Sequence, residues 1–307
     1  KNTQALTVSN IRQETLNSVV ISFEIPSNLK SQYAFKAGQY LTLSSNINGE
    51  KVKRSYSICS SPESMSLQVG VKAIENGVFS NYVNDALREG DSIEVSIPEG
   101  RFVLDDNPIA NYCAFVAGSG ITPLMSIVSD VLSKNESSVF IMGYGNKTKA
   151  STMFTSDIDE LKSLYPKRFY CYNIYSKENN TEAAFGRIDS NFINYVLKQH
   201  SDISFEKVLL CGPEKMIEDS KETLEKANYS KDKVLYELFY SKPAVEDNEK
   251  GKGSSAKIIY DEETLDLEVP EKMTILDAAL QKNIDVPYSC QGGVCSSCIA
   301  KITSGTA

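Results

Sequence analysis

Residues 112–123 read Tyr-Cys-Ala-Phe-Val-Ala-Gly-Ser-Gly-Ile-Thr-Pro, an apolar run that leads into a glycine turn and then into a helical pattern. Glycines at such a turn let backbone N–H groups approach a phosphate, and the start of the following helix favours negative charge. Gly118 and Gly120, with the hydroxyl of Thr122, therefore predict a seat for the pyrophosphate of a nucleotide. The turn is shorter than the GxGxxG fingerprint of dehydrogenases, so that fingerprint is not the basis of the prediction.

The alternation of a buried strand with a helical pattern continues along residues 108–241. The strand-like runs are Tyr112–Ala117, Val139–Tyr144, Phe169–Tyr175, Lys207–Cys211 and Val234–Phe239. Strands that alternate with helices in this way are typical of a doubly wound parallel sheet. We therefore predict an α/β nucleotide-binding domain in this part of the chain.

Residues 1–107 have a different pattern. Short strand-like runs, such as Ser18–Phe23, are separated by turn residues. This pattern predicts an antiparallel β-barrel. One helix interrupts it, which we expect at Asn81–Leu87, with Ser80 as its N-cap and Gly90 as its stop.

The C-terminal part of the chain is smaller. Residues 242–255 are predicted to be a linker, because residues 246–255 are polar, include glycine and have no apolar side chain. Two strand-like runs, Lys257–Tyr260 and Leu265–Val269, then precede a helix from Thr274 to about Lys282. Residues 256–307 are therefore expected to form a small α+β domain.

A group of cysteines follows this last helix. Residues 288–298 read Tyr-Ser-Cys-Gln-Gly-Gly-Val-Cys-Ser-Ser-Cys, with C-x4-C-x2-C spacing. Three thiolates on one glycine-rich loop suit iron, and the glycines let backbone N–H groups approach the cluster sulfurs. Plant-type ferredoxins have this spacing, so Cys290, Cys295 and Cys298 are predicted ligands of a 2Fe-2S cluster. The fourth cysteine that such a cluster needs is expected beyond Ala307.

Zinc is the alternative metal for clustered cysteines. It would call for a second C-x2-C pair or a histidine to complete a tetrahedron. The only histidine, His200, ends a helical pattern and is expected to be solvated, while Cys59, Cys113 and Cys171 lie in apparent strands elsewhere. Iron is therefore favoured over zinc.

Two short motifs in the first domain resemble the flavin motifs of the ferredoxin-NADP reductase superfamily. Arg54-Ser55-Tyr56-Ser57 ends a strand-like run, and Gly77-Val78-Phe79-Ser80 opens the helix. The residue types suit the chemistry, because an arginine can clamp a phosphate and a tyrosine ring can lie on the isoalloxazine. Taken singly, Arg54 would be read as a surface residue, Tyr56 as core and Gly77 as a turn.

The resemblance implies a role toward FAD for each of these positions. Tyr56 would stack on the flavin, and Ser57 would hydrogen-bond its hydride-accepting nitrogen. The segment Gly77–Ser80 would seat the pyrophosphate at the N-terminus of the helix. Val71 and Lys72 would run along the edge of the flavin.

The second half of the nucleotide domain resembles the nicotinamide site of the same superfamily. Cys211-Gly212-Pro213-Glu214 follows the fourth predicted strand. The resemblance implies that Gly212 and Pro213 leave room for the nicotinamide ring and that Cys211 lies near its reactive carbon. Read alone, Cys211 would be a small buried hydrophobe. The last strand ends in Glu237-Leu238-Phe239, which is either a buried strand or the place of an aromatic ring near the flavin.

The choice between NADPH and NADH depends on the segment after the third strand of this domain. Ser176 and Lys177 lie there, and Arg187 follows shortly after. By the resemblance, a hydroxyl and cations at this place would bind the 2′-phosphate of NADPH. An NADH enzyme more often has an acidic residue here, and Glu178 keeps that alternative open. We expect NADPH in preference to NADH.

Composition limits the partners and the location. The 307 residues carry a formal net charge of −8, with a pI near 5.0, so a nucleic-acid backbone would be repelled. The apolar stretches fall short of the roughly 20 residues that span a bilayer. Four of the seven cysteines are scattered singly in apolar runs, which indicates a reducing compartment. We expect the protein in the cytoplasm.

The order of the domains resembles that of the reductase components of multicomponent oxygenases. Arg54–Cys59, Tyr144–Asn146 and Tyr288–Cys295 are similar to segments of reductases of the phenylacetyl-CoA epoxidase type. The resemblance implies that NADPH passes a hydride to FAD and that single electrons continue to a 2Fe-2S cluster in a β-grasp ferredoxin domain. It also implies a protein acceptor, an oxygenase or a hydroxylase.

Three other readings are compatible with the sequence. One is the electron-transfer subunit of a larger flavoenzyme, and another is a reductase for a desaturase. The third is a ferredoxin-like binding module on an inactive reductase scaffold. The presence of Arg54, Tyr56 and Thr122 in the cofactor motifs argues against this third reading. The identity of the acceptor and the oligomeric state have no signal in the sequence.

Overall fold

The computed structural model describes residues 3–64, 66–105, 110–239, 253–260, 263–270 and 273–282, together with Ile284, Val286, Cys298 and residues 300–305. The chain forms two compact units, residues 1–239 and residues 240–307. No helix within the described residues has the length and apolar character needed to cross a membrane.

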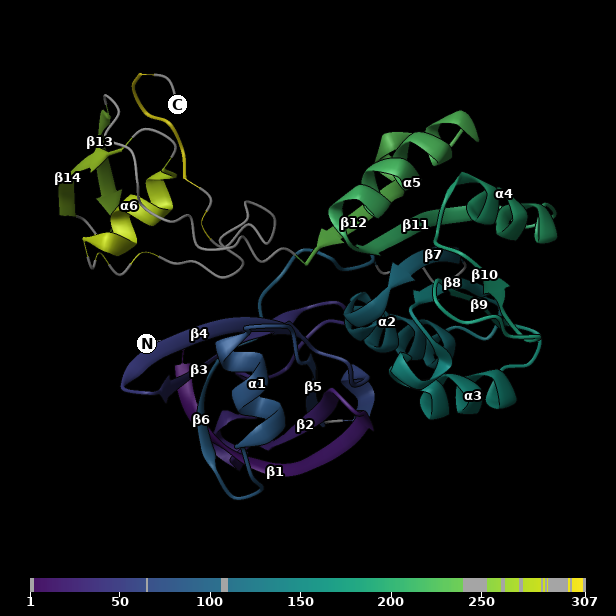
Figure 1. Ribbon diagram of the computed structural model, residues 1–307, viewed down its shortest axis with the longest axis horizontal. Coiled ribbons are helices and arrows are strands. Elements are labelled where there is room, and N and C mark those ends of the chain that lie inside the picture. Colours follow the sequence, from purple (N-terminus) through teal and green to yellow (C-terminus); the bar gives the residue numbers. More distant parts are fainter. Residues whose placement is uncertain are drawn as a thin grey trace. The chain divides into compact units, whose positions relative to one another are not determined.

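The first unit begins with an antiparallel sheet of six strands in the order β4-β3-β6-β1-β2-β5. The strands are β1 Thr3–Thr15, β2 Ser18–Glu24, β3 Tyr40–Ile47, β4 Glu50–Ser57, β5 Leu67–Lys72 and β6 Ser92–Ser96, with short 3-10 helices η1 Ser27–Leu29 and η2 Pro62–Ser64. The sheet curls (Figure 1), and a bridge between Ile58 and Val69 joins its two outer strands. This confirms the predicted antiparallel barrel.

The helix of the barrel, α1 (Val78–Asp85), begins earlier than the sequence predicted. Gly77 is its N-cap, so the prediction of Ser80 as N-cap is wrong. The Ser80 hydroxyl is buried, donates to the Gly77 carbonyl at 3.4 Å and accepts the Ile74 N–H at 3.3 Å. Ser80 therefore ties the preceding turn together from inside the first turn of the helix.

A parallel sheet of six strands follows in the order β10-β9-β8-β7-β11-β12. The strands are β7 Asn111–Ala117, β8 Phe140–Asn146, β9 Phe169–Tyr175, β10 Ala184–Phe185, β11 Phe205–Gly212 and β12 Val234–Leu238. The helices are α2 Ile121–Lys134, α3 Thr155–Leu164, α4 Ser190–Gln199 and α5 Glu214–Lys226, with 3-10 helices η3 Gly118–Gly120, η4 Lys149–Ser151 and η5 Lys231–Lys233. Helices α2 and α3 cover one face and α4 and α5 the other (Figure 1), which confirms the doubly wound α/β prediction.

The strand order reverses between β7 and β11, which are neighbours in the sheet. Val116 of β7 is paired with Cys211 of β11, so the glycine turn after β7 and Gly212 after Cys211 lie side by side. The loop after β7 enters α2 on one face, and the loop after β11 enters α5 on the other. Open α/β sheets bind ligands outside the carboxyl ends of the strands at such a reversal.

One apolar core joins the barrel to the nucleotide domain. The barrel residues Val20, Ala37, Cys59 and Phe102 belong to the same buried cluster as the inner side chains of α2. The barrel and the nucleotide domain therefore pack on each other through a shared apolar core. The predicted boundaries, residues 1–107 and 108–241, stay predictions.

The prediction that His200 is solvated is wrong. This residue follows α4 and is 8% exposed. Its Nε2 lies 2.8 Å from the Tyr172 hydroxyl, and its ring packs on Tyr170 with 4.8 Å between the ring centroids. Burial lowers the pKa of His200, whereas the carboxylate of Asp202 raises it.

The second unit contains a β-hairpin and a helix. Strands β13 (Ser254–Tyr260) and β14 (Glu263–Val269) are antiparallel, and α6 (Ile275–Gln281) follows. Thr274 caps α6 by accepting the Asp277 N–H at 3.0 Å. The predicted strands and helix are confirmed. Ser254 and Ser255, predicted as the end of the linker, belong to β13 because they pair with β14.

Candidate functional site

The end of β4 supplies the barrel side of the site. Arg54 is exposed, and its Nη1 donates to the Lys53 carbonyl at 2.7 Å. The ring of Tyr56 packs on Phe79 of α1, with 5.9 Å between the centroids, and burial raises the pKa of its phenol. Ser57, the last residue of the strand, is 3% exposed. The strand thus passes from an exposed cation to a buried hydroxyl within four residues.

Strand β5 lies beside these residues. Val71 is buried in the barrel core, so its backbone and not its side chain could face a ligand. Lys72 turns toward the nucleotide domain, where its Nζ donates to the Ser151 carbonyl at 3.2 Å. Burial lowers the pKa of Lys72, and the nearby Lys147 lowers it further. Lys72 therefore contacts both domains.

A shallow hollow of about 400 Å³ runs along α1 from the Gly77 N-cap to the Ala86 C-cap. It is lined by Ile47, Asn48, Asn76, Gly77, Val78, Asn81, Tyr82, Asp85 and Ala86. The first N–H groups of a helix have no partner within the helix, and the helix dipole adds positive potential there. Phe79 faces the core and Val78 the surface, so the start of α1 fits an anionic group beside Gly77 and Val78.

The glycine turn after β7 approaches the backbone of β11 closely. A Cβ atom on Gly120 would collide with the Cys211 carbonyl oxygen and would lie 2.7 Å from its carbonyl carbon. Gly118 has a φ of +56°, which favours glycine, and has open space where its Cβ would be. The turn therefore needs Gly120 for space and Gly118 for its conformation, and it leaves room above Gly118.

Thr122 is buried in the first turn of α2. Its hydroxyl donates to the Ser119 carbonyl at 3.0 Å, so its hydrogen is already used within the turn. The hydroxyl of Tyr144, fully buried in β8, lies 3.2 Å from the Gly118 carbonyl oxygen and 3.4 Å from that of Met153. These two hydroxyls hold the carbonyl groups of Gly118 and Ser119. The N–H groups of the glycine turn are then the donors that it can offer to a phosphate.

Cys211, Glu237 and Ser57 converge where the barrel meets the nucleotide domain. The Ser57 hydroxyl donates to Oε2 of Glu237 at 3.3 Å. Glu237 is paired with Cys211 across β11 and β12. Burial raises the pKa of the Cys211 thiol well above its usual value, and the charge of Glu237 raises it further. Cys211 is therefore a thiol at neutral pH.

The residues predicted to choose between NADPH and NADH lie together at the carboxyl edge of the sheet. The Ser176 N–H donates to the carbonyl of Asn146 at the end of β8, and the Lys177 N–H donates to that of Lys147. Arg187 follows β10, which pairs with the end of β9. Lys177 and Arg187 are exposed. The carboxylate of Glu178 accepts the Lys149 N–H at 2.8 Å, so it is held toward that loop.

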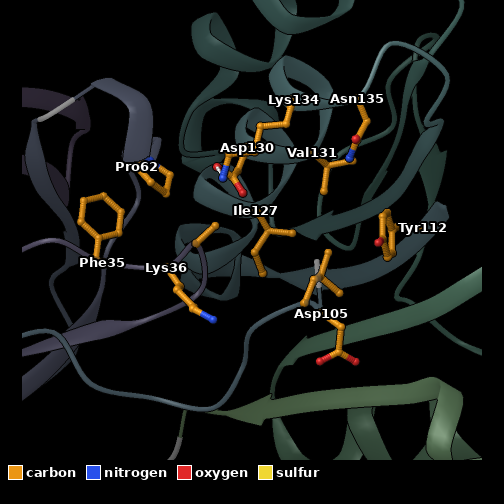
Figure 2. Close-up of a pocket in the computed structure, with 12 residues that line it drawn as sticks. Phe35, Lys36, Pro62, Asp105, Tyr112, Ile127, Asp130, Val131, Lys134 and Asn135 are labelled. Carbon is orange, nitrogen blue, oxygen red and sulfur yellow. Dashed lines mark ion pairs between the residues drawn. The ribbon is translucent and has the colours of Figure 1, made fainter. Parts of the chain in front are cut away.

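A separate cavity of about 260 Å³ lies at the other end of α2 (Figure 2). It is lined by Phe35, Lys36, Ala37, Pro62, Leu104, Asp105, Tyr112, Ile127, Asp130, Val131, Lys134 and Asn135. Tyr112 is the second residue of β7, and Lys134 ends α2, where it is paired with Asp130 at 2.7 Å. The cavity therefore lies at the amino edge of the sheet, away from the glycine turn.

Three family models match the chain in the order of its domains. The oxidoreductase FAD-binding domain matches residues 5–104, the oxidoreductase NAD-binding domain residues 115–222 and the 2Fe-2S iron-sulfur cluster binding domain residues 258–307. A component of the 1,2-phenylacetyl-CoA epoxidase of Escherichia coli (strain K12) is 35% identical over 317 residues, which cover 98% of this chain and 87% of that protein. The chain belongs to the ferredoxin-NADP reductase family.

Two further proteins resemble this reductase, one in sequence and one in fold. The ferredoxin reductase component of the 3-ketosteroid-9-alpha-monooxygenase of Rhodococcus rhodochrous is 30% identical, over 98% of this chain and 86% of that protein. The second is the crystal structure of a ferredoxin NADP+ reductase from Neisseria gonorrhoeae with bound FAD and NADP. It matches 78% of this chain and 100% of that chain with a TM-score of 0.67 at 18% identity, and this likeness shows the fold alone. The reductase is an electron-transfer oxidoreductase with FAD, NAD and 2Fe-2S domains.

The cysteines predicted to bind the cluster of the reductase are only partly described. Cys290 and Cys295 lie outside the described residues, and Cys298 is half-buried. Within the residues that the structure describes, no three metal-binding side chains are grouped. The 2Fe-2S domain match covers all three cysteines, but their assignment as ligands stays a prediction.

Glu237 is the residue of the reductase site that the sequence left without a role. A carboxylate at the end of an apolar strand indicates a candidate site residue, because a buried charge needs a hydrogen-bonding partner. The partner itself had no signal in the sequence, since Ser57 lies 180 positions earlier.

Proposed function

We propose that this reductase takes a hydride from NADPH and delivers electrons singly, through FAD and the 2Fe-2S cluster, to a protein of the oxygenase class. FAD, when bound, accepts the two electrons of a hydride and releases them one at a time, and a 2Fe-2S cluster carries single electrons. The observation that carries the proposal is the convergence of Ser57, Cys211 and Glu237 at the junction of the two domains.

These three residues position the reactants and exclude water. Ser57 gives its hydroxyl hydrogen to Glu237, so its oxygen could accept the N–H that the hydride-accepting nitrogen carries in reduced FAD. Cys211 stays protonated, so it fills space beside the nicotinamide and does not act as a nucleophile. Gly212 and Pro213 leave room for the nicotinamide ring. Holding two reactants in line is the main contribution that a protein makes to such a transfer.

The two anionic groups of the cofactors have separate seats. We assign the FAD pyrophosphate to Arg54 and to the start of α1, where Gly77 and Val78 line one end of the hollow. We assign the nucleotide pyrophosphate to the N–H groups of Gly118 and Gly120. Thr122 then holds the shape of the turn, since its hydrogen goes to Ser119.

The flavin seat has a direct test in the FAD content of purified variants. Arg54→Ala is expected to lower bound FAD, because the phosphate loses its cation, and to lower NADPH-driven reduction of an artificial electron acceptor in proportion. Lys53→Ala, which removes the neighbouring cation, is the control and is expected to keep both. Full FAD content and activity in Arg54→Ala would overturn the flavin site.

Ser176, Lys177 and Arg187 are proposed to bind the 2′-phosphate of NADPH. Hydrogen bonds to charged groups contribute about 1.5–3 kcal/mol, so Lys177→Ala or Arg187→Ala is expected to lower kcat/KM for NADPH about tenfold or more. The same constant for NADH should stay unchanged, and Lys198→Ala, which removes an exposed cation from α4, should change neither. An equal loss with both nucleotides would count against the 2′-phosphate site.

The acceptor and the location follow from separate observations. Both relatives described above are components of an epoxidase or a monooxygenase by name, which supports an oxygenase acceptor here. Cys59, Cys113, Cys171 and Cys211 are free thiols, which supports a reducing compartment and therefore the cytoplasm. Capture of the acceptor by the reduced protein, followed by its identification, would test the first proposal.

A further inference from the structure

The end of barrel strand β1 is bound to the start of α3 in the nucleotide domain. Oε2 of Glu14 accepts the Phe154 N–H at 2.7 Å, and the Glu14 side chain is 5% exposed. Arg12 donates to both carboxylate oxygens of Asp157, at 3.0 Å and 3.3 Å. The Arg12 Nη1 also lies 3.0 Å from Oε1 of Glu14. One buried carboxylate therefore accepts a backbone N–H across the domain interface.

The residue that Glu14 holds has an unfavourable backbone. Phe154 has a φ of +59°, and the other non-glycine residues with positive φ in the described parts are Asn48, Asn76 and Asn228. Asparagine tolerates this conformation, whereas for other residues it is unfavourable and persists only where the surroundings impose it. The hydrogen bond from the Phe154 N–H to Glu14 is such a constraint.

The turn that ends at Phe154 contacts the strand predicted to run along the flavin. A Cβ atom on Gly70 of β5 would lie 3.2 Å from Cζ of Phe154 and 3.3 Å from Cε of Met153. It would also lie 2.6 Å from Cγ2 of Thr122, at the start of α2. Gly70 precedes Val71 and Lys72, so the nucleotide domain packs on the backbone of the strand at the flavin edge.

The same turn is linked to the nucleotide site on its other side. The Tyr144 hydroxyl lies within hydrogen-bond distance of both the Met153 and the Gly118 carbonyl oxygens. Lys72 adds a bond to the Ser151 carbonyl. A chain of contacts therefore runs from Glu14 through Met153 and Phe154 to the glycine turn, and from the same two residues to β5.

We propose that Glu14 is a positioning residue for hydride transfer. Its carboxylate holds the Met153–Phe154 turn against Gly70 and so sets the separation between the glycine turn and β5. The inference rests on the proposed function, because the separation matters if nicotinamide and flavin meet between these elements. A misplacement of about 1 Å can cost on the order of a hundredfold in rate. Glu14 touches neither reactant.

Two substitutions at Glu14 and one control separate this role from general stability. Glu14→Ala removes the acceptor, whereas Glu14→Gln keeps an oxygen that can accept the Phe154 N–H. Glu89→Ala is the matched control, because the Glu89 carboxylate also accepts a β1 N–H, that of Ile11 at 3.0 Å, but entirely within the barrel. The measurements are the rate of flavin bleaching at saturating NADPH and the Kd for NADPH, from one anaerobic rapid-mixing series on the FAD-loaded protein.

In Glu14→Ala the limiting bleaching rate is expected to fall about tenfold or more, with Kd for NADPH within about threefold of wild type. Glu14→Gln should recover most of the rate, and Glu89→Ala should keep it. A wild-type rate in Glu14→Ala, an equal loss in Glu89→Ala, or no rescue by glutamine would overturn the proposal. If the unsubstituted protein shows no bleaching with NADPH, the proposed function itself fails, and this role fails with it.

Gly70→Ala tests the same proposal without a change at Glu14, and it serves if Glu14→Ala does not fold. It leaves Glu14 in place and inserts a methyl group between β5 and Thr122. The bleaching rate is expected to fall while chemical reduction of the flavin by dithionite proceeds as in wild type. An unchanged rate with NADPH would show that the separation of these elements does not control the transfer, and would overturn the proposal.

Discussion

Ser57 of the barrel donates its hydroxyl hydrogen to the Glu237 carboxylate of the nucleotide domain, with 3.3 Å between Oγ and Oε2. Ser57 ends β4, and Glu237 lies one residue before the end of β12, so the bond joins the ends of two strands from different domains. Both residues are buried, and Cys211 lies beside Glu237 in the neighbouring strand. In the proposed function this is where nicotinamide meets flavin.

Removal of the Glu237 carboxylate is expected to slow flavin reduction by NADPH. Glu237→Ala leaves the buried Ser57 hydroxyl without its acceptor, and we expect a loss of about tenfold or more in the bleaching rate. Glu237→Gln keeps an acceptor oxygen and should retain more of the rate. Glu214→Ala, which removes an exposed carboxylate at the start of α5, is the control. A wild-type rate in Glu237→Ala would contradict this assignment.

The glycine turn offers two substitutions that act by different mechanisms. Gly120→Ala is expected to lower the free energy of unfolding by about 1–3 kcal/mol, because its Cβ would meet the Cys211 backbone. Gly118→Asn places a residue that tolerates positive φ in open space and should cost less. Urea unfolding followed by circular dichroism measures both. Equal losses would show that the close approach of Gly120 to β11 is not what requires glycine there.

The buried His200 is expected to make stability depend on pH. Its folded-state pKa lies below the usual 6.5, so the unfolded chain binds the extra proton first. Stability is therefore complete above pH 6.5 and is lost as the pH falls from 6.5 through the lower folded-state value. Because His200 is the only histidine, His200→Gln should flatten this part of the curve. If the free energy of unfolding falls equally in both proteins as the pH drops through this window, the expectation is refuted.

The predicted cluster ligands can be separated from the flavin by one substitution. Cys298→Ser is expected to lower bound iron and sulfide and to stop electron delivery to a one-electron protein acceptor, while NADPH still bleaches the flavin. Cys171→Ser, which changes a thiol of the nucleotide domain, is the control and should keep its iron. Iron analysis and visible absorbance make the comparison. Full iron content in Cys298→Ser would remove this residue from the ligand set.

Much of the fold could be predicted because its signals are local. Predicted strand Phe169–Tyr175 coincides with β9, and the predicted helix from Thr274 coincides with α6 and its cap. The misses are local too. The two-residue strand β10 is too short to produce a pattern, and Ser80 has the residue type of an N-cap although its hydroxyl bonds backward to Ile74.

The site could be predicted less fully, because its decisive contacts join distant residues. The motifs located Arg54, Ser57, Gly118 and Cys211, yet no pattern connects Ser57 to Glu237 or Glu14 to Phe154, which are 180 and 140 positions apart. Such pairs depend on which surfaces of two domains meet. No short stretch of a single sequence indicates which surfaces pack together. The burial of His200 against Tyr172 could not be predicted for the same reason.

The most direct test of the central claim is anaerobic rapid mixing of the protein, loaded with FAD and its cluster, with NADPH while flavin and cluster absorbance are followed separately. We expect the flavin band to bleach first and the cluster absorbance to fall afterwards, and we expect Arg54→Ala lacking FAD to show neither change. A cluster that is reduced at the same rate without FAD, or one that stays oxidised after the flavin is bleached, would contradict electron flow from NADPH through FAD to the cluster.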